Sequence, residues 1–128
     1  MRYFKKIIGE KCYLSPINIE DAEKYTEWLN DFEIAKYLLL YRQQITMTKE
    51  KEILAKMSEK GDFIFAIIDK KTDKLIGNCG FHNINAVNQR AEFGIFIGDK
   101  NCQNKGFGTE AGKLLLDFGF NILNLNNI

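Results

Sequence analysis

Three extended apolar runs follow one another in the second half of the chain, and no helical pattern interrupts them. They cover residues 63–69, 74–82 and 90–98, with polar or glycine-containing segments between them. The link from Lys70 to Asp73 has the composition of a hairpin turn. We therefore expect these runs to form an antiparallel meander, in which strands that are neighbours in sequence are neighbours in the sheet.

The segment before the meander begins with one further strand and continues as a helix. Residues 11–17 alternate in character, and Pro16 is typical of a strand end or an edge strand. Asn18 is a good N-cap, and two acidic residues follow it in the first turn, where the helix dipole favours them. We expect this helix to run from Ile19 to Leu29.

Three more helical segments are expected. A short one covers Asp31 to Leu40, and a charged one covers Lys49 to Glu59 with Thr48 as its N-cap and Gly61 as its stop signal. The last helix begins at Gly106. Its apolar side chains recur at helical spacing and are Ala111, Leu114, Leu115, Phe118 and Ile122.

This order of elements indicates an α+β (α/β) fold, with a mixed, mostly antiparallel sheet and flanking helices. The chain has 128 residues, which is enough for one domain and not for two. No repeat, low-complexity segment or linker divides it. We expect residues 1–128 to form a single domain.

Charge and hydropathy exclude several classes of protein. Lys and Arg total 18 against 17 for Asp and Glu, so the net charge of +1 excludes nucleic-acid binding through bulk charge. No apolar run approaches the roughly 18 residues that span a bilayer. The basic first residues lead into Gly9 and polar residues rather than into the apolar part of a signal peptide. We expect a cytoplasmic protein with no membrane or nucleic-acid partner.

The cysteines and the histidine argue against a metal site. Cys12, Cys79 and Cys102 are odd in number and far apart, which favours reduced thiols over a disulfide framework. His82 is the only histidine, and the sequence contains no Cys-x-x-Cys pair. No metal is therefore expected, whereas Cys102 with His82 as a nucleophilic pair stays open beside the ordinary interpretation as a buried thiol.

The segment most informative about chemistry is the glycine-containing loop 103–109, between the last strand and the last helix. Glycines there let several N–H groups at the helix start point outward, where they and the helix dipole bind an anion such as pyrophosphate. The spacing is not that of a P-loop, and Gly112 comes one position too late for a dinucleotide fingerprint. Glycines before a helix also occur for purely structural reasons, so the context decides.

In that context Gln103, Gly106 and Gly108 match the acetyl-coenzyme A (acetyl-CoA) loop of the GNAT superfamily of N-acetyltransferases: Gln or Arg, two residues, Gly, one residue, Gly or Ala. The resemblance extends through residues 75–80, 90–98 and 112–120. The chain resembles the subgroup that contains ribosomal-protein (RimJ/RimL type) and spermidine N-acetyltransferases. The resemblance implies a GNAT-like fold and acetyl-CoA as cofactor, in a domain truncated after the helix that follows the loop.

The resemblance also implies where the cofactor binds. The strand before the loop would pair with the pantetheine arm, much like an added strand, and the N–H groups of the loop would surround the pyrophosphate. The implied cofactor-binding residues are Ile95, Phe96, Ile97, Gln103, Asn104, Lys105, Gly106, Phe107, Gly108 and Thr109. Lys100 and Lys105 either add charge near the phosphates or are merely solvated.

Acetyl transfer to a primary amine needs a base, an oxyanion donor and an acid for the thiolate. Glu92 is the candidate base and His82 the other candidate, although both residues have ordinary structural roles on a strand. The backbone at Ile95 or Phe96 is the candidate oxyanion donor. No residue is assigned as the acid, because the tyrosine that relatives use would lie beyond Ile128.

The leading function is therefore an acetyl-CoA-dependent N-acetyltransferase that acts on a protein N-terminus, a polyamine or a small amine. Trp28, Tyr37 and Tyr41 either shape its acceptor pocket or belong to the core. One alternative is a truncated acetyl-CoA-binding protein with little or no catalysis, completed by a partner or dimer mate; another is an interaction protein that keeps only the fold. Truncation would leave the strand 91–97 as an edge, and such edges recruit partners, so we expect a homodimer.

Overall fold

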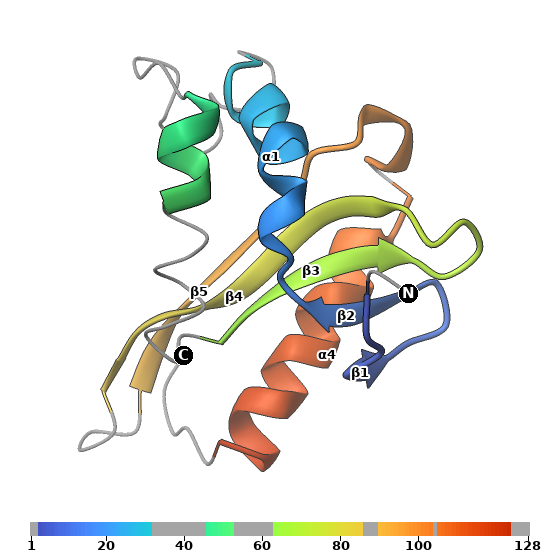
Figure 1. Cartoon of the computed structure of the whole chain (residues 1–128). Helices are drawn as coiled ribbons and strands as arrows, with labels where there is room; N and C mark the ends of the chain where they lie inside the picture. Colours follow the sequence, from blue (N-terminus) through green and yellow to red (C-terminus); the bar gives the residue numbers. More distant parts are fainter. Residues whose placement is uncertain (1–2, 32–45, 53–62, 86–89, 104, 124–128) are drawn as a thin grey trace. The chain divides into compact units, whose positions relative to one another are not determined.

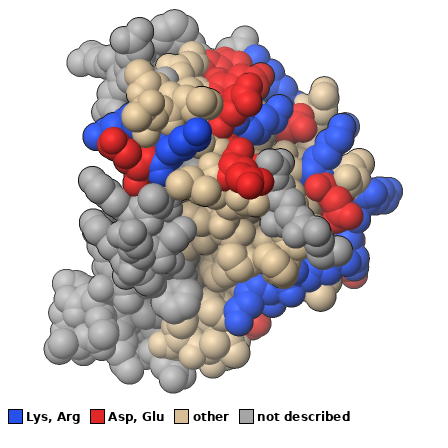
Figure 2. Space-filling model, viewed as in Figure 1, with Lys and Arg blue, Asp and Glu red and all other residues tan. Residues whose placement is uncertain are grey.

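The computed structural model describes residues 3–31, 46–52, 63–85, 90–103 and 105–123, with the backbone alone for residues 63, 82–85 and 90–93. The chain divides into two compact units. The first unit combines Met1–Pro16 with Asp62–Ile128, and the second is Ile17–Gly61. In the described part of the chain, no helix is both long enough and apolar enough to cross a membrane. Basic and acidic side chains are interspersed on the face drawn in Figure 2.

The first unit contains a five-stranded sheet in which each strand pairs antiparallel with the next along the chain. The strands are β1 (Ile7–Ile8), β2 (Cys12–Pro16), β3 (Phe63–Asp69), β4 (Leu75–Asn85) and β5 (Arg90–Ile97) (Figure 1). The predicted meander is confirmed, and so is the α+β class. The strand β1 was not predicted, because two residues are too few to show an alternating pattern.

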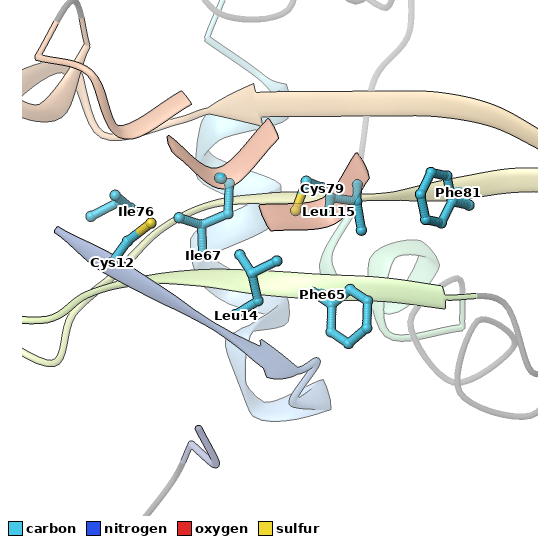
Figure 3. Packing of buried hydrophobic residues seen from close by; sticks show 9 residues of the cluster. Cys12, Leu14, Phe65, Ile67, Ile76, Cys79, Phe81 and Leu115 are labelled. Atoms are coloured by element: carbon cyan, nitrogen blue, oxygen red, sulfur yellow. The ribbon is translucent and has the colours of Figure 1, made fainter. Parts of the chain in front are cut away.

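The helix α4 (Phe107–Asn121) lies against one face of this sheet (Figure 1). Alternating residues of β2 and β3 meet the helix there, as the period of two in a strand requires. On β4 a register irregularity opposite Ile67 and Ile68 brings both Ile76 and Cys79 to this face. Figure 3 shows these side chains gathered between the strands and the helix. The buried cluster consists of Cys12, Leu14, Phe65, Ile67, Ile76, Cys79, Phe81, Ala111 and Leu115. This packing fixes where the first turn of α4 lies.

One residue of the predicted apolar helix face does not belong to it. Ile122 is 65% exposed, whereas Leu114 and Phe118 pack against the core. The helix ends at Asn121, and the Phe118 carbonyl accepts hydrogen bonds from the N–H groups of both Ile122 and Leu123. Because the helix ends one residue before Ile122, the predicted period no longer places its side chain on the core.

The second unit contains η1 (Ile19–Asp21), α1 (Ala22–Leu29) and a helix described over residues 47–52. The predicted cap is confirmed, since the Asn18 side chain accepts a hydrogen bond from the Glu20 N–H at 2.9 Å. The prediction of Thr48 as the next cap was wrong. The Lys49 N–H donates to the Thr46 hydroxyl at 3.2 Å, so the helix begins two residues earlier than predicted. The predicted helix at 31–40, apart from residue 31, and the rest of the charged helix lie outside the described residues.

Candidate active site

The strand β5 bends sharply where it ends. The Ile76 carbonyl accepts hydrogen bonds from two successive N–H groups, those of Gly98 at 2.8 Å and Asp99 at 3.1 Å. Gly77, which pairs with Ile97, allows this close crossing, because a Cβ atom there would collide with the Phe96 carbonyl oxygen. The bend carries the chain off the sheet and toward α4.

The outer edge of β5 carries backbone groups that β4 does not use. In an antiparallel pair, hydrogen-bonded residues alternate with residues whose N–H and C=O groups point away from the partner. The bond from Gly98 to Ile76 sets this alternation, so Phe96 faces β4 whereas Ile95 and Ile97 face the other side. Within the described residues β4 is the one neighbour of β5. The N–H and C=O groups of Ile95 and the N–H of Ile97 are therefore placed to pair with an added extended chain.

A short 3-10 helix, η3 (Lys100–Cys102), follows the bend. Asp99 caps it by accepting a hydrogen bond from the Asn101 N–H at 2.9 Å. The next residue, Gln103, donates from Nε2 to the Ile97 carbonyl at 2.9 Å. The glutamine of the predicted loop thus ties the loop to the open edge of β5. Asn104 lies outside the described residues.

The loop enters α4 through a left-handed glycine. Gly106 has φ +87°, a backbone conformation that residues with a side chain rarely adopt, and the helix begins at the next residue. The N–H groups of Phe107, Gly108 and Thr109 occupy the first turn, where a helix offers them no acceptor. A Cβ atom on Gly108 would lie 3.7 Å from Ile97 Cγ1, so this turn adjoins the end of β5. An extended arm at the edge and an anion at the helix start could therefore belong to one ligand.

Glu110 joins α4 to the turn between β1 and β2. Its carboxylate accepts backbone N–H bonds from Glu10 at 3.0 Å, Lys11 at 2.9 Å and Cys12 at 2.8 Å, and one from Cys12 Sγ at 3.2 Å. Burial raises the pKa of Glu110, but the hydrogen bonds from Cys12, Lys11 and Glu10 outweigh burial and hold this pKa below its ordinary value. Glu110 is therefore a charged fastening of the helix to the sheet.

Lys11 is the residue that sequence reasoning missed at this loop. Its ammonium donates to the Lys105 carbonyl at 2.8 Å and lies 5.9 Å from the centre of the Phe107 ring. A Cβ atom on Gly106 would be 3.4 Å from the same nitrogen. Lys11 is 94 residues from Lys105 in sequence, so no local motif joins them, and their proximity depends on how α4 packs on β2.

The predicted catalytic residues lie on adjacent strands. His82 and Glu92 are paired in the register of β4 with β5, two residue pairs from Gly80 and Gly94. For these two residues the structure describes the backbone. Cys102 is partly buried, and burial raises the pKa of its thiol, which does not favour the nucleophilic alternative. Among the described residues, no group of three His, Cys, Asp or Glu side chains is arranged to hold a metal ion.

The remaining predicted residues are two lysines and three aromatic residues. Lys100, in η3, and Lys105, in the loop, are both exposed. Trp28 packs edge-on against Tyr25 within the second unit, with ring centres 5.8 Å apart. Tyr37 and Tyr41 lie outside the described residues.

Comparison with known proteins points to one family. A family model described as acetyltransferase (GNAT) domain matches residues 11–128. An uncharacterized N-acetyltransferase, p20, of Bacillus licheniformis is 35% identical over 127 residues, which are 93% of this chain and 68% of that protein. The chain thus spans about two thirds of the length of this relative.

Two further similarities concern spermidine N-acetyltransferases. The spermidine N(1)-acetyltransferase of Escherichia coli strain K12 is 52% identical over 42 residues, which are 33% of this chain and 22% of that protein. The crystal structure of spermidine N-acetyltransferase from Vibrio cholerae in complex with CoA and spermine superposes with a TM-score of 0.81 at 25% identity. That match covers 91% of this chain and 68% of the other.

Proposed function

Because the chain belongs to the GNAT acetyltransferase family, whose members use acetyl-CoA, we propose that it transfers the acetyl group to a primary amine. The acceptor is a protein N-terminus, a polyamine or another small amine. This proposal covers residues 1–128 as one GNAT domain of the RimJ/RimL or spermidine N-acetyltransferase type. It places the enzyme in the cytoplasm, in keeping with three cysteines that are all free.

The observation that carries the proposal is the meeting of two unlike binding surfaces at the end of β5. One is a strand edge, where Ile95 and Ile97 direct backbone groups away from β4. The other is the start of α4, where Gly106 is left-handed and Gly108 adjoins Ile97. Acetyl-CoA has a pantetheine arm that can pair with a strand edge and a diphosphate that suits a helix N-terminus, in this order along one molecule.

The predicted cofactor residues take distinct parts in this proposal. Ile95 and Ile97 offer backbone groups to the pantetheine arm, whereas Phe96, whose backbone faces β4, offers its side chain. Phe107, Gly108 and Thr109 offer their N–H groups to the diphosphate. The other members of the proposed site shape or flank the loop and are Gln103, Asn104, Lys105 and Gly106.

Chemistry at the amine requires that its proton be removed before or during attack. We assign this task to Glu92, directly or through water, with His82 opposite it as the second candidate. Acetyl-CoA supplies the thioester carbonyl, and the N–H of Ile95 at the open edge is the donor for the oxyanion. No residue of the described chain is assigned as the acid for the thiolate.

An amine acceptor is favoured by the spermidine N-acetyltransferases among the similar proteins. The experiment is a measurement of thiol release from acetyl-CoA with a panel of amines: spermidine, spermine, an N-terminal peptide of a ribosomal protein and an aminoglycoside. Release that depends on one class of amine identifies the acceptor. Binding of acetyl-CoA without release for any amine contradicts the transferase proposal and favours the alternative, an acetyl-CoA-binding protein that a partner completes.

A further inference from the structure

We propose that Lys11, at the start of the sheet and far from the loop in sequence, binds the diphosphate of acetyl-CoA. This inference rests on the proposed function and extends it, because it adds a cation from the turn between β1 and β2 to a site otherwise built from β5 and α4. Three contacts place the Lys11 ammonium at the loop: the Lys105 carbonyl at 2.8 Å, the Phe107 ring at 5.9 Å, and Gly106, on which a Cβ atom would be 3.4 Å away.

The ammonium has hydrogen-bonding capacity left after these contacts. An ammonium carries three N–H donors, and the Lys105 carbonyl accepts one of them. The Lys11 side chain is exposed, so the remaining donors face solvent at the point where the first turn of α4 begins. An anion held by the N–H groups of Phe107 and Gly108 would lie beside this charge, and hydrogen bonds between charged partners are about twice as strong as neutral ones.

The backbone of Lys11 is held on both sides, which separates it from an ordinary surface lysine. Its N–H donates to the Glu110 carboxylate at 2.9 Å, and its carbonyl accepts from the Lys70 N–H at 3.0 Å. Glu110 itself belongs to α4, one turn after Gly106. The helix that offers N–H groups to the anion therefore also fixes the turn residue that offers the charge. Glu110 is in this sense a positioning residue for Lys11.

Two other lysines nearby make different contacts. Lys105 contributes its carbonyl to the contact with Lys11. Lys70 lies in the turn between β3 and β4, and its ammonium donates to the Gly9 carbonyl at 3.2 Å. Lys70 thus gives a matched control, because it is an exposed lysine whose ammonium donates to a backbone carbonyl outside the loop.

The test measures the affinity for CoA and for 3′-dephospho-CoA by calorimetry for the wild type, Lys11→Gln, Lys11→Arg and Lys70→Gln. We expect Lys11→Gln to weaken both ligands by the same factor, roughly tenfold, which is the size of one charge-assisted hydrogen bond. Lys11→Arg should retain most of the affinity and Lys70→Gln all of it. The loss should shrink at high salt, as for a contact between charges.

Several results would overturn the assignment. Unchanged affinity in Lys11→Gln shows that the ammonium has no part in binding, and a loss confined to CoA moves it to the 3′-phosphate. A loss that Lys11→Arg does not restore and that salt does not alter shows that Lys11 only shapes the loop. If the wild type binds neither ligand, the proposed function itself fails, which is a different result from a wild type that binds beside an unaffected variant.

Discussion

Glu110 gathers three consecutive backbone N–H groups on one carboxylate, and a neutral side chain of the same size cannot do this equally well. In glutamine, the amide nitrogen is itself a donor and would face those N–H groups. We therefore expect Glu110→Gln to lower the free energy of unfolding by about 1–2 kcal/mol at neutral pH. Urea denaturation followed by circular dichroism measures this. Asp117→Asn is the control, because Asp117 accepts a bond from Asn121 on the same exposed helix face, and its effect should be small.

The same carboxylate makes the stability depend on pH. Its pKa is lowered in the folded chain from an ordinary value of 4.5, so the charged form is favoured by folding. This contribution is fully present above pH 4.5 and is lost as the pH falls through the lower pKa of the folded state. The wild type and Glu110→Gln should therefore differ in unfolding free energy at pH 7, and this difference should shrink as the pH falls below 4.5. A difference that stays constant as the pH falls below 4.5 would contradict the assignment of the charge to Glu110.

Glu92 is the residue on which the proposed proton transfer depends. Glu92→Gln should reduce the rate of thiol release at neutral pH by about 10²–10⁴-fold, which is what a general base contributes. The affinity for acetyl-CoA should not change, because the replaced group is not in the proposed cofactor site. A discontinuous assay of free thiol gives the rate, and calorimetry of CoA binding gives the affinity. An unchanged rate would remove Glu92 from the mechanism and leave His82 as the candidate, which His82→Gln then tests.

At the scale of elements, the two glycines at the start of α4 have different roles. Gly106 is left-handed, so Gly106→Ala should cost about 1–2 kcal/mol of stability, the penalty of that conformation for an L-residue. Gly108 lies inside the helix with ordinary space beside Ile97, so Gly108→Ala should fold normally or gain up to about 1 kcal/mol. Thermal unfolding of the two variants tests this contrast, and equal destabilisation would contradict it.

The bulkier Gly108→Val addresses the ligand rather than the fold. A branched side chain there should block the close approach of an anion to the first-turn N–H groups, and we expect a loss of CoA affinity of at least tenfold in a folded protein. Gly108→Ala, with less bulk, serves as the matched comparison. Normal CoA binding by the valine variant would show that the diphosphate lies elsewhere.

The elements that the sequence predicted well are those with a strong local signal. The strand β3 has the predicted limits, and Asn18 caps η1 as expected, because alternation and capping depend on nearby residues. The start of the helix at residue 47 shows the limit of such signals. Thr46 and Thr48 are equally good N-caps by residue type, and the sequence does not show which of the two hydroxyls accepts the hydrogen bond from the Lys49 N–H. Contacts such as Lys11 with Lys105 depend on packing between distant segments and carry no local signature.

For the whole molecule, the arrangement of strands bears on self-association. In the described sheet β1 and β5 are the edge strands, and an unpaired edge invites a second strand. Apolar side chains are also exposed near the end of α4, where Phe120 is 46% and Ile122 65% exposed. We therefore expect a homodimer in solution, most simply a twofold one in which the β5 strands of two chains pair.

This dimer should respond to the cofactor, because the proposed site for the pantetheine arm is the same edge of β5. Light scattering after size exclusion at micromolar concentration should give the mass of two chains without ligand, and saturating acetyl-CoA should shift it toward one. A dimer that acetyl-CoA leaves intact would place the interface elsewhere, and Phe120→Ser would then show whether the apolar end of α4 forms it. A monomer at every concentration would contradict the pairing of β5 strands between two chains.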